Sequence, residues 1–179
     1  MEQAVAIVEF WKKAGPGRWF ARDAAFDALF RERFLDQHLA ASRREYEEWL
    51  CTADGVLGLM LLLDQFPRNA FRGTAHAYAT DPLARHYAMR AIEEGVDLQI
   101  EPQLRAFVYL PFEHSEDPVD QQRSVAMFQT LGDARALEYA LIHQDVIARF
   151  GRFPHRNAAL GRIPTVAELE FLADGGFAA

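Results

Sequence analysis

Apolar residues recur along this chain at the spacing of amphipathic helices. Val5, Val8 and Trp11 repeat every three residues near the N-terminus, which places them on one face of a helix. Later segments repeat the pattern at intervals of three or four residues. No segment shows the alternation of apolar and polar residues, rich in β-branched side chains, that is typical of strands. The pattern therefore predicts an all-α protein.

One stretch is apolar around nearly the whole helical circumference rather than along one face. It extends from Asp54 to Gln65 and contains the uninterrupted apolar run Val56–Leu63. A helix of this kind is expected to be enclosed by others. Its apolar run is too short to cross a bilayer, which takes about 20 residues, so we expect no membrane partner. We expect this helix to end at Pro67, because proline lacks the N–H group that would continue the hydrogen bonding.

Helix start and stop signals divide the rest of the chain. Asp81 and Asp117 are each followed by proline, a combination typical of a capped first turn. Pro111 is expected to end the helix that precedes it, and Thr165–Glu168 has the residues of a capping box. The linkers between these signals are short, so we predict about nine helices in a single domain, residues 1–179.

Composition narrows the class of protein. Asp and Glu total 26 against 19 Lys and Arg, a formal net charge of -7, which argues against a nucleic-acid partner held by bulk charge. Cys51 is the only cysteine, so no disulfide can form within the chain, and the first residues lack the basic region of a secretory signal. Both features favour a cytoplasmic location. No glycine-rich nucleotide-binding motif occurs, and we predict no cofactor.

Positive charge is concentrated in one segment of this acidic chain. Residues 149–162 contain four arginines and His155, and no acidic residue lies between Asp145 and Glu168. A shorter copy of the pattern, Phe-Pro followed by Arg-Asn-Ala and then a further Arg and a Gly, occurs at residues 66–73. Guanidinium groups this close in sequence repel one another unless carboxylates or a bound anion lie between them.

Three motifs resemble those of a known family. They are Leu61–Asn69 followed by Arg72 and Gly73, Tyr109–Glu116, and Phe150–Asn157 followed by Leu160, Gly161 and Arg162. In these stretches the chain resembles the bacterial domain-of-unknown-function family numbered 924, and the similarity extends over nearly the whole chain. The resemblance implies an all-helical, tetratricopeptide-like array. It implies no established activity.

A polar site built from these motifs is the main functional hypothesis. The candidate ligand-binding residues are five arginines and two asparagines: Arg68, Asn69, Arg72, Arg152, Arg156, Asn157 and Arg162. Set against the five arginines, the two acids Asp64 and Glu116 would leave three positive charges for a small anionic ligand, a phosphate or a carboxylate. His114 and His155 are the candidate catalytic acid and base if the protein is a hydrolase or transferase.

The same residues could instead be purely structural. Asp64, Glu116 and His143 would then belong to an internal network that holds the arginines, since His143 lies mid-helix on an inward-facing side. The protein would in that case be a scaffold that binds a protein partner through an exposed aromatic groove, with Trp19–Phe20 and Phe71 as candidates. A metal site is not predicted, because the arginines would oppose a divalent ion and no His-Glu-x-x-His helix is present.

Overall fold

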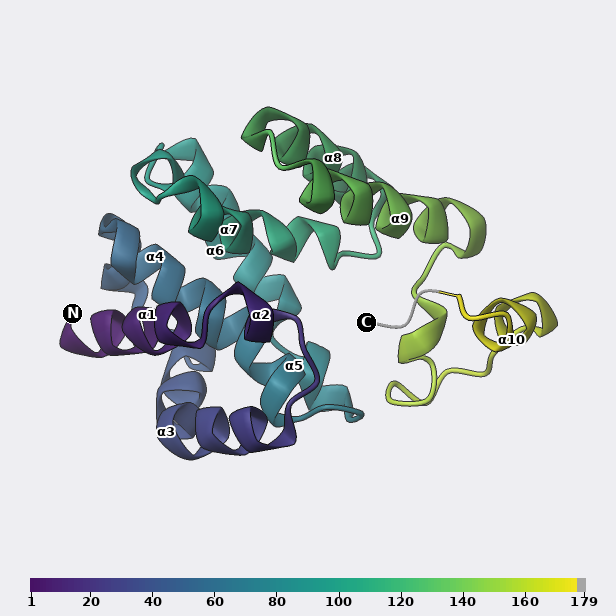
Figure 1. Ribbon diagram of the computed structural model, residues 1–179, viewed down its shortest axis with the longest axis horizontal. Coiled ribbons are helices and arrows are strands. Elements are labelled where there is room, and N and C mark those ends of the chain that lie inside the picture. The colour runs from purple at the N-terminus through teal and green to yellow at the C-terminus, as the bar shows by residue number, and fades with distance from the viewer. Residues whose placement is uncertain (177–179) are drawn as a thin grey trace. The chain divides into compact units, whose positions relative to one another are not determined.

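All regular structure in the computed structural model, which describes residues 1–176, is helical (Figure 1). No strand occurs in this range, so the all-α prediction is confirmed. Nor does any helix in the same range have a stretch long and apolar enough to span a bilayer.

The chain forms two compact units. Unit 1 comprises Met1–Arg72 and His76–Pro111, and unit 2 comprises Gly73–Ala75 and the chain from Phe112 onward. That the chain is one tetratricopeptide-like domain stays a prediction.

The helices of unit 1 follow one another closely in sequence. They are α1 (Glu2–Ala14), α2 (Pro16–Trp19), α3 (Ala24–Ser42), the 3-10 turn η1 (Glu47–Cys51), α4 (Ala53–Met60), the π-helical turn η2 (Leu61–Gln65), α5 (Phe66–Ala70), η3 (Ala75–Tyr78), α6 (Asp81–Glu93), η4 (Asp97–Gln99) and α7 (Pro102–Glu113). The first residue of η3 and the last two of α7 belong to unit 2. Unit 2 continues with α8 (Pro118–Leu131), α9 (Ala134–Phe150), η5 (Pro154–Arg156) and α10 (Val166–Ala173).

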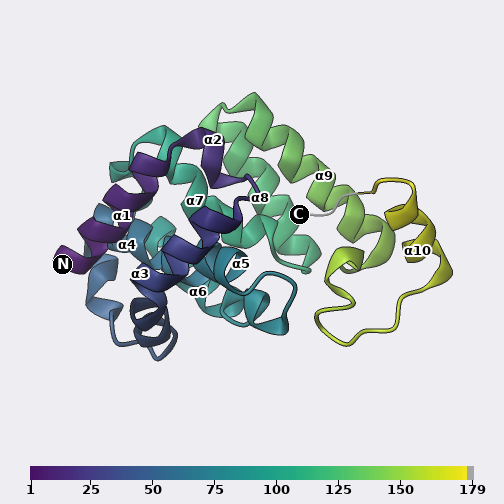
Figure 2. The same cartoon turned by 60° about the horizontal axis from the view of Figure 1, so that its bottom comes forward.

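The centre of unit 1 is the continuous helical path of α4 and η2. Every side chain of the run Val56–Leu63 is buried, as the sequence predicts. Helices α1 and α6 pack against α4, and α3 packs against η2 (Figures 1 and 2). This helix is therefore the core around which the rest of unit 1 is arranged.

Gly55 in α4 is required by close packing against η1. Thr52 caps this first turn by accepting a hydrogen bond from the Gly55 N–H at 3.1 Å. A Cβ atom at position 55 would clash with the carbonyl oxygen of Trp49, a backbone atom that cannot rotate away. A Cβ atom at Gly58 would instead lie 3.4 Å from Ala4, an ordinary van der Waals contact.

The predicted end of the central helix at Pro67 is wrong, because the helical path continues through this proline into α5. Pro67 has no N–H group to donate to the carbonyl groups four and five residues before it, those of Leu63 and Leu62. Side chains from other elements supply donors instead. The Thr80 hydroxyl donates to Leu63 O at 2.5 Å, and His38 Nδ1 donates to Leu62 O at 2.8 Å. These distant donors allow the helix to continue.

His38 belongs to a pair of imidazoles in unit 1 and is fully buried. Because its Nδ1 donates to a carbonyl, its Nε2 carries the lone pair and accepts a hydrogen bond from Nε2 of His76 at 2.9 Å. Burial lowers the pKa of His38; the bond to Leu62 O opposes this, and His76 adds to it. The imidazole of His38 is therefore neutral near pH 7.

Helix α7 likewise continues past a proline. Pro111 lies inside the helix, which ends at Glu113, so the predicted stop at Pro111 is wrong. The fully buried Gln121 covers the carbonyl end of this helix, since its Nε2 donates to Glu113 O at 2.7 Å and to Ser115 O at 2.6 Å. The last carbonyl groups of a helix have no partner within it, and Gln121 supplies one.

Unit 2 is built on α8 and α9, which pack against each other. Asp117 and Asp133 cap their N-termini by accepting hydrogen bonds from backbone N–H groups, and Gly132 and Gly151 end them in the left-handed conformation. The capping box predicted at Thr165–Glu168 opens α10. Asp81 differs from its prediction, because Thr80 occupies the N-cap of α6 and Asp81 lies within the first turn.

Candidate functional site

Arg68 is held by two carboxylates inside unit 1. Its Nη1 and Nη2 donate to the two oxygens of Asp81 at 2.8 and 3.0 Å, and Nη1 lies 3.2 Å from Oδ1 of Asp64. Nη1 also donates to the backbone oxygen of Asp64 at 2.9 Å. Burial alone would lower the pKa of Arg68, but Asp64 and Asp81 outweigh it and raise this pKa. Arg68, a predicted ligand-binding residue, thus belongs to an ion triad.

Asn69 and Arg72 share a partner in α3, namely Asp27. Nδ2 of Asn69 donates to one oxygen of Asp27 at 2.6 Å, and Nη2 of Arg72 donates to the other at 3.0 Å. Asn69 is buried, whereas the Arg72 side chain is 37% exposed. Both predicted ligand-binding residues therefore tie α5 and the turn that follows it to α3.

Arg152 pairs with Glu168 inside unit 2. Its Nε and Nη2 donate to the two oxygens of Glu168 at 2.6 and 2.8 Å. The bond from Arg152 lowers the pKa of Glu168 to about 2, against the effect of burial, and the Thr165 N–H and the nearby Asn157 amide add to the lowering. Both amide atoms of Asn157 are buried, and neither forms a hydrogen bond of good geometry among residues 1–176.

Glu116 binds the other end of the same loop. Nη1 and Nη2 of Arg162 donate to its two oxygens at 2.7 and 3.0 Å, and the Phe153 N–H donates to it at 2.8 Å. Burial alone would raise the pKa of Glu116, but these hydrogen bonds outweigh it and lower this pKa. Glu116 and Glu168 together fix the segment from Arg152 to Arg162.

The predicted surplus of three positive charges is wrong. The count considers Asp64 and Glu116 alone, whereas Asp81, Asp27 and Glu168 also bind the motif arginines. The expected pairing of Arg152 with Asp64 or Glu116 is also wrong, since its hydrogen-bonded carboxylate is Glu168. Arg68, Arg72, Arg152 and Arg162 thus each have a carboxylate partner in the fold.

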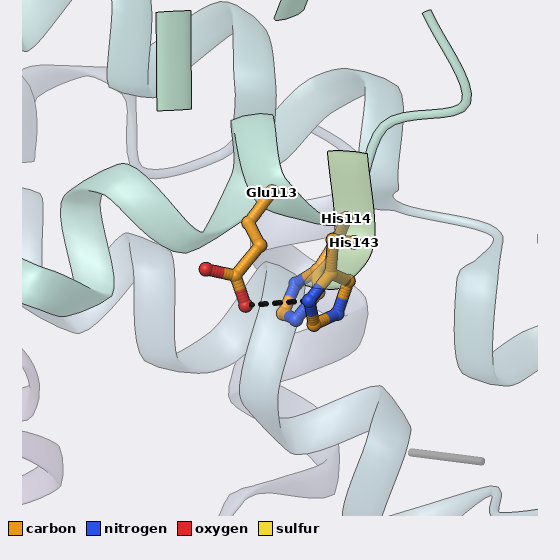
Figure 3. Close-up of side chains that lie close together, drawn as sticks. All are labelled: Glu113, His114 and His143. Atoms are coloured by element: carbon orange, nitrogen blue, oxygen red, sulfur yellow. Dashed lines mark ion pairs between the residues drawn. The ribbon is translucent and has the colours of Figure 1, made fainter. Parts of the chain in front are cut away.

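A different polar cluster lies where α7 ends beside α9. Glu113 and His143 are each 4% exposed, and Oε1 of Glu113 lies 3.3 Å from Nδ1 of His143. His114, which is partly buried, places its ring centroid 6.1 Å from that of His143. Figure 3 shows the three side chains close together, Glu113 from the end of α7, His114 from the turn that follows and His143 from α9.

His143 points inward, as its position in the helix predicts. Its Nδ1 lies 2.8 Å from the carbonyl oxygen of Tyr139, one turn earlier in α9, and donates to it. Burial lowers the pKa of His143 to about 3; charge on His114, Arg156 and His155 adds to this, while the Tyr139 carbonyl opposes it. The imidazole of His143 is therefore neutral near pH 7 where it meets Glu113.

The ring of Phe153 joins the remaining members to this cluster. His143 and His155 lie 5.5 and 5.6 Å from it between ring centroids, and the Arg156 guanidinium carbon lies 4.5 Å above it. Nη2 of Arg156 also donates to His114 O at 3.0 Å. Three predicted site residues, His114, His155 and Arg156, are thus gathered in unit 2 with His143.

Two members of this cluster are absent from the sequence-based candidates. The sequence does not mark Glu113 as a site residue, because Pro111 is expected to end the helix before it and His114 is the more evident candidate of the motif. Gln121 lies in no motif, and only its position in the fold shows that it covers the end of α7. The signal available for Glu113 is its place beside His114 in a stretch that resembles a family motif.

Comparison with known proteins bears on the family alone. The family model described as "Bacterial protein of unknown function (DUF924)" matches residues 7–176. The solved structure of a protein of unknown function from Agrobacterium tumefaciens is 55% identical, with a TM-score of 0.93, over 96% of this chain and 97% of that chain. Among functionally curated proteins no significant match was found. The chain belongs to the DUF924 family of bacterial proteins of unknown function.

Proposed function

We propose that unit 2 binds a small anionic molecule, a carboxylate or a phosphate, at the cluster of His114, His143, His155 and Arg156. The observation that carries this proposal is the gathering of His143, His155 and Arg156 around the ring of Phe153, with His114 and the buried Glu113 beside His143. Such a group of nitrogen donors favours an anion, particularly where the protein excludes water.

Arg156 is the fixed positive charge of this site. Its side chain is 6% exposed, lies over Phe153 and donates to His114 O. The guanidinium is therefore oriented before a ligand binds, and little side-chain entropy is lost on binding. An arginine in such surroundings forms stronger hydrogen bonds to a carboxylate or phosphate than one in water.

His114 and His155 connect the site to the protein surface and can transfer protons. His114 and His155 are partly exposed, so the cluster extends from the interior of unit 2 to its surface. An imidazole can donate or accept a proton, so both fit the roles of acid and base in a hydrolysis or transfer reaction of an acidic substrate. In this proposal Arg152 and Arg162 hold the loop that carries Arg156 instead of binding the ligand themselves.

The test is thermal unfolding in the presence of phosphate, sulfate and small carboxylic acids, with the protein either treated with a chelator or supplemented with Zn²⁺. A ligand at 100 times its dissociation constant adds about 2.7 kcal/mol to the free energy of unfolding. For a chain of this length that raises Tm by about 5 to 10 °C. We expect one class of anion to give this shift.

Two variants make the test specific. Arg156→Leu should abolish the shift, whereas Arg149→Leu should keep it, because the Arg149 side chain is 50% exposed and lies over the rings of Phe150 and Phe171. The absence of a shift with every anion, with and without metal, would rule out the proposed site.

A scaffold is the second candidate function, and an apolar groove on unit 2 supports it. The groove runs between α9 and α10 and is lined by Leu137, Leu141, Ile142 and Phe171, with Glu138 and Asp145 beside them. This arrangement suits an amphipathic helix with basic flanks. Of the aromatic residues proposed from the sequence, Trp19 is buried and Arg31 lies over Phe71, whereas Phe20 is 68% exposed. Leu141→Glu should abolish binding of such a helix, and unchanged binding would exclude this groove.

A further inference from the structure

We infer that Glu113, His114 and His143 bind one divalent transition-metal ion, and that this ion holds the anionic ligand together with Arg156. The part played by the ligand rests on the proposed function. The ion itself can be tested without any ligand.

The donor atoms are already close together. One carboxylate oxygen of Glu113 and one ring nitrogen from each of His114 and His143 all lie within 4.8 Å of one another (Figure 3). Zinc bonds to such atoms are about 2.0 to 2.2 Å long, so two ligands of one ion lie up to about 4 Å apart. The Glu113 oxygen lies 3.3 Å from Nδ1 of His143, so both side chains must rotate to place this oxygen beside the ring nitrogen that has the lone pair.

The residue types narrow the choice of ion. Two imidazoles and one carboxylate are the protein ligands of many catalytic zinc sites and of non-haem iron(II) sites. Both kinds of site leave coordination positions open, because three protein ligands do not fill the shell of the ion. An oxygen of a bound carboxylate or phosphate can occupy such a position.

Hydrogen bonds hold these ligands in position. Nδ1 of His143 donates to Tyr139 O, which fixes the ring and leaves the lone pair on Nε2. The backbone carbonyl of Glu113 is held by Gln121, and that of His114 by Arg156. A bond from the second ring nitrogen, such as that of His143, is typical of metal-ligating histidines, and its loss weakens metal affinity by about 10- to 100-fold.

The sequence suggests that the arginines of residues 149–162 would repel a divalent ion, but most of them are paired with carboxylates in the fold. Arg152 and Arg162 each form a bidentate pair with a carboxylate, Glu168 and Glu116. These pairs neutralise most of the charge that either arginine would present to the cluster. Arg156 is the remaining neighbour, and it can bind the same anionic group that the ion binds. The ligand would thus carry the negative charge that lies between the two cations.

The experiment starts from full-length protein treated with a chelator and then dialysed. Zn²⁺ and Co²⁺ are titrated in by calorimetry, and the visible absorption of bound Co²⁺ reports the nature of its ligands. We expect one ion per chain. Glu113→Gln and His143→Gln should each weaken binding at least 100-fold, and His86→Gln, a histidine of unit 1 far in sequence from the cluster, should leave it unchanged. Circular dichroism confirms that each variant retains its helices.

The outcomes separate the ion from the ligand. Stoichiometric binding that is lost in the two cluster variants, with anion affinity raised by the ion, supports the inference. The inference is overturned if the wild-type protein binds neither Zn²⁺ nor Co²⁺ stoichiometrically, a result that does not depend on how well any variant folds. It is also overturned if both cluster variants still bind the ion. Anion binding by chelator-treated protein would then still support the proposed function. Metal binding without anion affinity in either form would overturn the proposed function and the role of the ion in it.

Discussion

Replacement of Arg68 by leucine is the sharpest test of the ion network in unit 1. The Arg68 side chain is 18% exposed, and its two carboxylate partners are nearly or fully buried, with side chains that are 9% exposed for Asp81 and 0% for Asp64. Leucine would leave both carboxylates in place without the guanidinium that they share. Breaking a buried ion pair by removing one partner costs about 3 to 5 kcal/mol. For a chain of this length that lowers Tm by about 6 to 20 °C.

Arg72 provides the matched control. It lies four residues further along, also pairs with an aspartate and is 37% exposed. An exposed pair contributes about 0.2 to 1 kcal/mol, and Asp27 keeps its bond from Asn69 when Arg72 is lost. Arg72→Leu should therefore lower Tm by no more than about 4 °C. Arg68→Lys should fall between the two leucine variants, because lysine keeps the charge but cannot donate to both oxygens of Asp81 at once.

The assay is thermal and urea unfolding followed by circular dichroism. Equal losses at positions 68 and 72, or a loss below about 1 kcal/mol for Arg68→Leu, would refute the reasoning that burial decides the strength of these pairs.

Four further predictions concern two glycines, two titratable groups and a helix cap. Gly55→Ala should cost about 1 to 3 kcal/mol in chemical unfolding because its Cβ meets backbone, and Gly58→Ala should cost less than 1 kcal/mol; a ranking in the opposite order would contradict the packing of α4. The pKa of His38 is lowered in the folded state, so the unfolded chain binds this proton more readily and stability should fall as pH drops below about 6.5. His38→Gln should flatten this part of the curve of stability against pH. An unchanged slope would contradict a buried, neutral His38. The pKa of Glu168 is lowered to about 2, so its contribution is present above about 4.5 and is lost as pH falls from there towards 2; Glu168→Gln should remove that dependence. Thr165→Ala should cost about 1 kcal/mol, and no measurable loss would show that the capping box contributes nothing.

Local signals were enough to predict much of the fold. The cap at Asp117 and the capping box of α10 both involve residues within a few positions of one another. Their geometry follows from the chain nearby, so a sequence pattern predicts them well. The buried central helix is equally evident, because an apolar circumference can be stabilised only by enclosure.

The errors have a common cause in partners that are distant in sequence. Pro67 was expected to end a helix, but donors from His38 and Thr80 replace the bonds that it cannot make. Likewise the count of motif charges left out Asp27, which lies 45 positions from Arg72. No local pattern identifies such partners, since they are brought together only by the packing of the helices.

The sequence predicts only part of the candidate site, again because some of its members are brought together by distant parts of the chain. His114, His155 and Arg156 lie in motifs and do gather in unit 2, together with His143, which was assigned to the structural network. Glu113 joins them because α7 continues past Pro111 and carries this carboxylate to the end of the helix, facing α9. An expectation that the helix stops at Pro111 leaves the side chain of Glu113 without a defined direction.

The π turn between α4 and α5 makes the length of the central helix more important than its composition. A π turn accommodates one residue more than an α-helical turn of the same path. A turn that is already wide cannot absorb a further residue, so adding one within Leu61–Gln65 would rotate all that follows by about 100° about the helix axis. Arg68 would then turn away from Asp81. Exchanges among the leucines of this turn should therefore be tolerated far better than an added residue.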